Sequence, residues 1–509
     1  MAKRLSARVN DGDVGIGVLP EDQKVFVGGV DADAKLSLLC KISAKWRFLR
    51  DFPFDPNHNA CGWQTDDSWR PPRFLPTKVP TSKENHMDSR MQNHREWVKR
   101  ARLRLVDPGP TLPAVLMLTL ALASLAPAQT FTVLYSFSTP NDPSTTLVQD
   151  DQGNLYGTTI GDDGSPGTVF KLDTGRHLTT LYTFTGGSDG GRPNPELVRD
   201  SAGNFFGTTN QGGSKGAGVI FKLAAAGGES VLYNFCSQTN CLDGGSPRAG
   251  VIRDANGNLY GTTLMGGSND GGVVYKLEPN GKYTPLHGFR GGKDGTNPFA
   301  VLARDRAGIL YGTTPMGGQA GNGGCNHGPP GCGVVFKVDP TGKETLLHSF
   351  AWGTDGVGPF GGVVLDSAGN VYGATFIGGN HGCQANPPPP PRGCGTVYKI
   401  DKTGKESILY RWKAGSPAEY DPMAGLVRDR HGNLYGTTKY GGNFSCGGGT
   451  GCGTVFKLDP QGKLTVLHTF TGGADGAVPA FRLLLDRHGN LFGTTVGAGG
   501  LARIFKITP

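Results

Sequence analysis

The sequence predicts an all-β fold, a seven-bladed β-propeller of four-stranded antiparallel blades whose ring is closed by the N-terminal strand. A unit recurs seven times, reading Leu-Tyr-x-Phe, then Asp-x-x-Gly-Asn-Leu-Tyr-Gly-Thr-Thr, then Gly-x-Val-Phe-Lys-Leu. Repetition of this kind indicates a propeller, a solenoid or an array. Each unit also has four strand-like runs, and the chain ends carry complementary parts of one unit. The turn glycines of the units are Gly153, Gly203, Gly257, Gly308, Gly369, Gly432 and Gly489.

The four runs of a unit are short and have strand composition. In the third unit they cover residues 232–235, 250–253, 258–263 and 273–277, and Gly, Asp or Pro bounds them. Runs of four to six residues rich in Val, Ile, Tyr, Phe and Thr are typical of β-strands. No stretch after residue 129 has a useful apolar period of 3.6 residues, so we expect no helix there.

The turns between the runs are equally well specified. Asp-x-x-Gly joins the second run to the third in every unit, and Asp339 to Lys343 reads Asp-Pro-Thr-Gly-Lys. Asp accepts a backbone hydrogen bond from two residues on, and Gly takes the positive φ that ends such a turn. The second motif fits a tight hairpin into the next unit.

The two ends of the repeat region predict how the ring closes. Residues 134–137 form a Leu-Tyr-x-Phe run before the first full unit, whereas the last Phe-Lys run, 505–506, has none after it. We therefore expect residues 130–137 to supply the outer strand of the blade formed by about 480–509, which removes an open sheet edge. A parallel β-helix is the structural alternative, but it would need shorter coils and capped ends.

These units resemble the bacterial GloVer (Gloeo/Verruco) tandem repeat of exported proteins, over residues 131–507 and in all seven units. The resemblance implies a secreted or surface propeller and no defined activity. The chain differs from anchored members because it stops at Ile507-Thr508-Pro509 without a hydrophobic tail. This difference favours a free secreted or periplasmic protein.

Three regions are expected. Residues 1–98 carry no repeat and are interpreted as an over-extended gene model or an unstructured leader; the alternative is a cytoplasmic segment with an uncleaved anchor. Residues 99–128 have a basic start, an apolar run over 112–126 and Ala126-Pro127-Ala128, which is the order of a secretory signal peptide. The run is shorter than a spanning helix, so we expect no stable membrane insertion after cleavage. Residues 129–509 form the propeller.

The charge argues against nucleic acid as a partner. The chain has 50 Lys and Arg against 42 Asp and Glu, but 19 and 14 of these precede residue 129. The repeat region is thus nearly neutral and has no basic stripe.

Eight cysteines of the repeat region fall in four close pairs. An even number in local pairs behind a signal peptide predicts disulfides, with metal binding as the alternative. Propeller topology places all four pairs on one face. Three pairs lie between the third and fourth runs, which become the second and third strands of a blade, and one lies in a connection between units. The pairs are Cys236/Cys241, Cys325/Cys332, Cys383/Cys394 and Cys446/Cys452.

The long loops of that face add groups that a scaffold does not need. Rigid loops that carry aromatic, amide and arginine side chains suit a glycan or a cell-envelope protein. The alternative is that the disulfides only protect the loops. The candidate binding residues are Asn326, His327, Trp352, Asp355, Asn380, His381, Arg392 and Phe444.

Signals for catalysis and cofactors are weak. Gly-x-Ser-x-Gly occurs at 186–190 and 212–216 without the helix that a nucleophile elbow needs.

His287, His348 and His468 fill an outer-strand position that is Tyr in other units, and successive blades hold them far apart. We expect no shared metal site and no cofactor. The Asp-Gly turns at Asp189, Asp294, Asp355 and Asp475 could bind Ca²⁺, although turn formation is the simpler role.

The sequence therefore predicts an exported binding module for a glycan or an envelope protein, acting through the disulfide-bearing face. The alternative is a polysaccharide lyase or hydrolase with its site in the central funnel. A purely structural surface protein is the third interpretation.

Overall fold

The computed structural model describes residues 5–9, 12–18, 25–27, 129–138, 143, 145–161, 165–319, 325, 331–351, 353–379, 394–413, 421–446, 450–496 and 502–508. The chain divides into two compact units, 1–109 and 110–509. The first contains an antiparallel sheet of β1 (Leu5–Val9), β2 (Gly12–Val18) and β3 (Val25–Val27), in that order. The interpretation of residues 1–98 as a leader or a gene-model extension stays a prediction.

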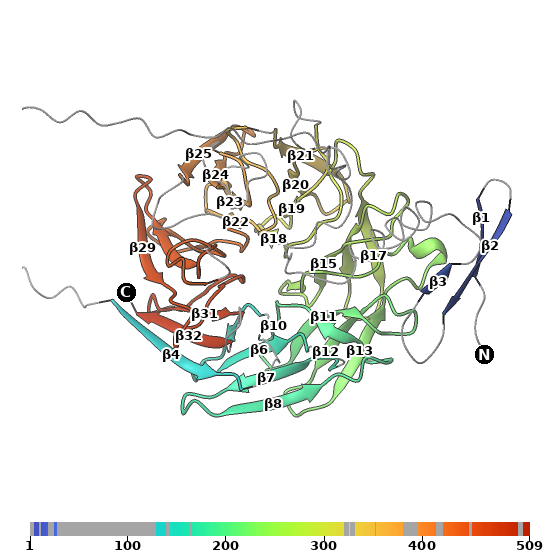
Figure 1. The fold of residues 1–509 in the computed structure, drawn as a ribbon, viewed down its shortest axis with the longest axis horizontal. Coiled ribbons are helices and arrows are strands. Elements are labelled where there is room, and N and C mark those ends of the chain that lie inside the picture. Colours follow the sequence, from blue (N-terminus) through green and yellow to red (C-terminus); the bar gives the residue numbers. More distant parts are fainter. Residues whose placement is uncertain are drawn as a thin grey trace, which may run out of the picture. The chain divides into compact units, whose positions relative to one another are not determined.

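The second unit is a propeller of seven antiparallel blades, as the repeats predict (Figure 1). One 3₁₀ turn, η1 (Thr239–Cys241), interrupts the described strands, and no helix in the described part is long and apolar enough to cross a membrane. From the innermost strand outward, the blades are: blade 1, β5 (Val148–Gln149), β6 (Leu155–Thr159), β7 (Thr168–Leu172), β8 (Leu178–Thr183); blade 2, β10 (Val198–Arg199), β11 (Phe205–Gln211), β12 (Val219–Leu223), β13 (Glu229–Asn234), with β9 (Gly191–Pro193) pairing β11; blade 3, β14 (Ile252–Arg253), β15 (Leu259–Thr263), β16 (Val273–Leu277), β17 (Tyr283–Gly288); blade 4, β18 (Ala303–Arg304), β19 (Leu310–Thr314), β20 (Val334–Val338), β21 (Glu344–Ser349); blade 5, β22 (Val364–Leu365), β23 (Val371–Thr375), β24 (Thr396–Ile400), β25 (Glu406–Arg411); blade 6, β26 (Val427–Arg428), β27 (Leu434–Thr438), β28 (Thr454–Leu458), β29 (Leu464–Thr469); blade 7, β30 (Leu484–Leu485), β31 (Leu491–Thr495), β32 (Arg503–Thr508), β4 (Thr130–Ser136).

The Asp-x-x-Gly turn organises the start of each second strand. In blade 1, Oδ1 of Asp150 accepts hydrogen bonds from the backbone N–H groups of Gln152 (3.0 Å) and Asn154 (2.9 Å). Oδ2 accepts from Asn154 Nδ2 (2.8 Å) and from the Tyr156 hydroxyl (2.9 Å), and Gly153 closes the turn at φ +89°. One carboxylate thus ties the turn to the strand that follows, which explains why Asn and Tyr recur in the unit.

The ring closes with the strand from the start of the propeller, as predicted. In blade 7 the outer strand is β4, which lies antiparallel to β32 and beside it in Figure 1. The register runs from Ser136 opposite Arg503 to Thr130 opposite Thr508. The seventh blade therefore has the same four-strand order as the others, although it is built from both ends of the propeller sequence.

Two kinds of loop share one face of the ring. They are the loops between second and third strands and the connections from one blade to the next. The N–H of Gly267, in a second-to-third loop, donates to the carbonyl of Cys241, in a connection (3.0 Å). Cys236–Cys241, Cys325–Cys332 and Cys446–Cys452 are disulfides in these loops. We call this side the disulfide face; the Asp-x-x-Gly turns lie on the opposite side, the turn face.

The glycine of Leu-Tyr-Gly-Thr-Thr makes room for an aromatic ring on the neighbouring third strand. In blade 4, a Cβ at Gly312 would lie 2.5 Å from Cζ of Phe336 and 2.8 Å from Cδ2 of Leu302. Both of these side chains are buried in the core between blades. The glycine is therefore needed for close packing, not for a turn.

We expect Gly312→Ala to lower the free energy of unfolding by about 1–3 kcal/mol, because an added methyl group overpacks a dense core. Urea denaturation of the full chain measures the change. Gly288→Ala is the matched control, because no atom lies within 4 Å of a Cβ at that strand position. Equal destabilisation by both variants would contradict the packing role.

At the outer rim, each outer strand carries a Tyr or His that meets the first residue of the next blade's outer strand. In some blades the residue at the start of the next blade's outer strand is a glutamate, and its carboxylate then lies beside an aspartate. Glu229 faces Asp189. Burial raises the pKa of Glu229 to about 7, and the negative charge of Asp189 contributes to the shift. Burial likewise raises the pKa of Glu406 to about 7, and Asp355 adds to the effect.

We expect Glu229→Gln to stabilise the protein above neutral pH. The folded protein holds the Glu229 proton up to a pKa of about 7, against the ordinary glutamate value of 4.5. Between these values the folded state binds more protons than the unfolded state, so wild-type stability falls as pH rises. The variant lacks this fall, and its melting temperature should exceed that of the wild type above about pH 7 but not near pH 4. A difference independent of pH would contradict this assignment.

Candidate functional site at the channel mouth

The innermost strands surround the centre of the ring (Figure 1). Two residues before each inner strand, one position per blade recurs around this axis, and several neighbouring members touch. The Thr146 N–H donates to the carbonyl of Pro195 (2.9 Å), next to Glu196, and the Gly250 N–H donates to Oε2 of Glu196 (3.0 Å). We call this set the channel ring. Its members are Thr146, Glu196, Gly250, Val301, Gly362, Gly425 and Arg482.

The channel ring holds one acidic and one basic side chain, and both are half-buried. Burial raises the pKa of Glu196, although the Gly250 N–H and the charge of Arg482 oppose the shift. Burial lowers the pKa of Arg482, and Glu196 opposes that shift. Nε of Arg482 is buried and has no hydrogen-bond partner among the described residues. The two charges attract each other across the channel without forming a close ion pair in the described structure.

Two further arginines lie toward the disulfide face. Arg192 is in β9, and Arg248 directly follows Pro247, whose carbonyl accepts a hydrogen bond from Nδ2 of Asn194 (2.9 Å). Burial lowers the pKa of Arg248, and the like charge of Arg192 lowers it further. Nε of Arg248 is buried without a hydrogen-bond partner in the described part of the chain. A guanidinium in this state is desolvated and poised to receive an anion.

The other side of the mouth is aromatic. Phe299 and Phe360 start the inner segments of blades 4 and 5, and their rings meet edge to face at 5.8 Å. The ring of Phe376, which follows β23, packs on Phe360 at 5.5 Å. All three side chains are only half-buried. Aromatic rings of this kind provide flat apolar surface.

A buried lysine adds a positive group in blade 6. Lys439 follows β27 and is only 6% exposed, and its Nζ lies 5.0 Å from the centre of the Tyr440 ring. Burial lowers the pKa of Lys439, while the charge of Asp421 acts against this. In the other blades the same position holds Ile160, Asn210, Leu264, Pro315, Phe376 and Val496. Lys439 is thus a departure of one blade from the repeat.

Below the channel ring, a cavity of about 510 Å³ lies between the inner strands toward the turn face. Its described lining includes Arg304, Arg428 and Arg482 among aliphatic side chains, and no acidic residue. Two of these arginines stack on rings of the preceding blade, Arg304 on Tyr260 (5.5 Å) and Arg428 on Tyr372 (5.6 Å). The charged residues of the described cavity lining are thus all arginines, and Nη2 of Arg304 also lies 3.9 Å from Oδ2 of Asp254.

The repeat family is decided by comparison with family models. Residues 121–326, 195–448 and 325–509 each match the Gloeobacter/Verrucomicrobia repeat, so the matches together span the propeller. The chain belongs to the Gloeobacter/Verrucomicrobia repeat family. The resemblance seen in the units is thereby confirmed, and no curated protein matches this repeat protein.

Solved propeller structures are only weakly similar to this Gloeobacter/Verrucomicrobia repeat protein. The X-ray structure of a putative gluconolactonase is 11% identical, with 75% of this chain and 92% of that chain covered and a TM-score of 0.37. TolB from Acinetobacter baumannii is 12% identical, with 61% and 62% covered and a TM-score of 0.33. The fold rests on the blades described above.

Only two of the predicted binding residues, Phe444 and Asp355, lie in the described part of the repeat protein. Asn326, His327, Trp352, Asn380, His381 and Arg392 lie outside the described residues, as does Cys383, although Cys394 is disulfide-bonded. Phe444 is 49% exposed in the loop between β27 and β28. Asp355 accepts the Ala351 N–H (2.9 Å) and lies by His348 at the outer rim, away from the channel.

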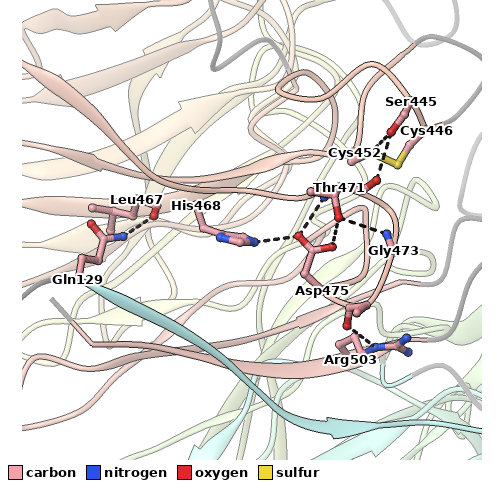
Figure 2. Close-up of polar contacts among 11 residues, drawn as sticks. Gln129, Ser445, Cys446, Cys452, Leu467, His468, Thr471, Gly473, Asp475 and Arg503 are labelled. Carbon is pink, nitrogen blue, oxygen red and sulfur yellow. Dashed lines mark hydrogen bonds and ion pairs between the residues drawn. A yellow bond between two sulfur atoms is a disulfide. The ribbon is translucent and has the colours of Figure 1, made fainter.

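The disulfide loops are anchored to the rim turns. In blade 6, the Asp475 carboxylate accepts hydrogen bonds from the Thr471 N–H (3.0 Å) and meets Nε2 of His468 at 3.1 Å (Figure 2). The Ser445 hydroxyl, next to Cys446, donates to the Thr471 carbonyl (3.1 Å). The Asp-Gly turns therefore support the disulfide loops.

Sequence reasoning missed the channel residues of the repeat protein, although a signal exists. Each inner segment reads Pro-x-x-x-apolar, and the third variable position is the channel-ring position. Aligning the units on that proline singles out Glu196, Arg248 and Arg482. The sequence prediction instead placed the binding residues in the long, cysteine-containing loops.

Proposed function

We propose that this propeller is an exported binding module for an acidic glycan, whose carboxylates enter the channel from the disulfide face. The observation that supports the proposal is Arg248, a desolvated arginine beside a second arginine, with a buried Nε that has no partner in the described structure. Two neighbouring guanidinium groups repel each other, and a carboxylate between them would remove that cost.

The chemistry around the pair favours a sugar acid. Arginine pairs with a carboxylate through two parallel hydrogen bonds, which fixes the orientation of the ligand. Phe299 and Phe360 offer apolar ring faces for the C–H surface of a pyranose, and the amide of Asn194 lies next to the arginines. Binding sites of this kind combine apolar surface with a few placed polar groups.

Export is part of the proposal. Disulfides persist in oxidising compartments outside the cytoplasm, and three of them brace the loops around the mouth. The signal-like residues 99–128 would direct the chain there.

A polysaccharide lyase or hydrolase is the second candidate, and one observation favours it. Glu196 is a buried carboxyl group whose pKa is raised, as a general acid requires. Its partner across the channel is an arginine, and the described channel lining supplies no second carboxylate beside it, so binding is the stronger proposal.

One assay separates binding from turnover. The full chain, produced with oxidised cysteines, is mixed with immobilised polygalacturonate or with the neutral glucan dextran on the same matrix. We expect depletion of protein by the acidic polymer alone, without new reducing ends in solution. Release of reducing ends would overturn the binding proposal in favour of an enzyme. Depletion by neither polymer would contradict the glycan proposal and direct the search to an envelope protein.

A further inference from the structure

Three side chains with metal-binding atoms converge at the outer rim between blades 4 and 5. His348 is on β21, Asp355 is in the turn that follows, and Glu406 begins the outer strand β25. Nε2 of His348 lies 3.5 Å from Oδ2 of Asp355 and 3.9 Å from Oε1 of Glu406. One donor atom from each of the three lies within 4.8 Å of the other two.

Two of the donor atoms are buried and have no hydrogen-bond partner. They are Nε2 of His348 and Oε1 of Glu406, in the part of the chain that the structure describes. The three side chains are 19%, 20% and 15% exposed, so little water reaches them. Buried polar atoms without partners are uncommon in folded proteins and each calls for a bound group or another explanation.

We propose that His348, Asp355 and Glu406 form a binding site for a divalent transition-metal cation of the Zn²⁺ class. One imidazole nitrogen and two carboxylate oxygens are ligands that Zn²⁺ accepts, and three protein ligands leave a fourth position to water. The cation would bridge adjacent blades, because His348 and Asp355 come from blade 4 and Glu406 comes from blade 5.

The distances suit such an ion. Ligand atoms about 2.0–2.2 Å from Zn²⁺ at a tetrahedral angle lie about 3.3–3.6 Å from each other. The His348–Asp355 separation of 3.5 Å is within that range, and the His348–Glu406 separation of 3.9 Å exceeds it by a few tenths of an ångström. The Asp355–Glu406 separation is bounded at 4.8 Å, so side-chain rotation would have to draw the two carboxylates together around the ion.

Other blades show what happens when one ligand is replaced. In blade 1 the His position is Tyr182, whose hydroxyl donates to Asp189 (2.9 Å) next to Glu229. In blade 6 the Glu position is filled by Phe131 of β4, which stacks on His468 at 3.6 Å between ring centres. In blade 1 the aspartate accepts a hydrogen bond from the tyrosine, and in blade 6 the imidazole stacks on a phenylalanine ring.

A related set lies between blades 3 and 4. Nε2 of His287 is 3.6 Å from Asp294, and Glu344 is the carboxylate of the next blade. No ion pair joins Glu344 to His287 in the described structure, so the convergence of three donor atoms is closer at His348. The sequence predicts no metal site, and this proposal departs from that prediction. His348 and Glu406 belong to different repeat units, and only the packing of adjacent blades brings them together.

The test measures bound metal on the full chain. The protein is stripped with a chelator, dialysed against Zn²⁺ and analysed for metal content, and Co²⁺ is then used as a spectroscopic probe. We expect His348→Tyr and Glu406→Leu each to lose one equivalent of Zn²⁺ relative to the wild type, together with the Co²⁺ band in the visible spectrum. Both substitutions place a residue that other blades use at the same position, Tyr182 and Leu464.

His468→Tyr is the matched control, because its blade has the same His–Asp pair but no glutamate. It should keep the metal content of the wild type. The proposal is overturned if the wild type binds no Zn²⁺, or if His348→Tyr and Glu406→Leu bind as much as the wild type. Thermal unfolding of each variant without metal shows that the blades are intact. Because the site is remote from the channel, glycan binding can fail while metal binding persists, and the reverse.

Discussion

Deleting residues 130–136 from the full chain is expected to abolish cooperative folding of the propeller. These residues are β4, and blade 7 then loses its outer strand and the whole backbone ladder with β32. Phe131, which packs on the buried rings of Phe470 and Phe505, is lost with it. An open sheet edge and an uncovered core remain, and both favour aggregation. Far-ultraviolet circular dichroism during heating measures the loss as an absent or broad transition.

The control deletes the first 128 residues and keeps β4. Because the propeller is a compact unit that begins before β4, this variant should unfold in one transition near that of the full chain. A sharp wild-type transition in the variant without β4 would contradict the closure of the ring by that strand. Loss of folding in the control would show that the preceding residues support the propeller.

Replacing Arg248 by Ala should weaken binding of an acidic oligosaccharide by about 10- to 100-fold, since a charged hydrogen-bonded pair contributes about 1.5–3 kcal/mol. The same change should leave the melting temperature unchanged or raise it. Arg248 is half-buried beside Arg192, its buried Nε has no partner among the described residues, and desolvation lowers its pKa. The folded protein therefore bears a cost for this charge. Isothermal titration and thermal unfolding measure the two effects.

Arg290→Ala is the matched control for Arg248→Ala. Arg290 is exposed in the connection after β17, on the same face but outside the channel. It removes the same charge and should change affinity less than about twofold at moderate salt. If both variants weaken binding equally, the ligand is held by the general charge of the face. A lower melting temperature for Arg248→Ala would indicate a structural role.

The sequence predicts the propeller well because the same turn motif and strand-like runs recur in every unit. Asp150 and its six equivalents start a turn that can be recognised locally, and the run at 134–137 is unpaired in the sequence, so ring closure follows from counting. The role of Gly312 is different. Its need for close approach to Phe336 is set by packing between strands, and no local turn signal reveals it.

The candidate site is less predictable, for a physical reason. Glu196 and Arg482 are distant in the sequence, and Arg192 and Arg248 belong to different repeat units. The members of each pair interact only because the inner segments converge on one axis. Their buried state, which makes them informative, is a property of the closed ring. His348 and Glu406 likewise belong to different units, and only the packing of adjacent blades brings the imidazole and the carboxylate within 3.9 Å.

The most direct test of acidic-glycan binding is titration of the full chain with a purified oligogalacturonate and with the same oligosaccharide after its carboxyl groups are reduced to alcohols. The two ligands differ only in charge and in the acceptor that arginine recognises. We expect saturable binding of the acid, weakened by salt, and a loss of at least about tenfold in affinity for the reduced form. Equal affinity for both forms, or no binding of either, would contradict an anion-binding channel mouth.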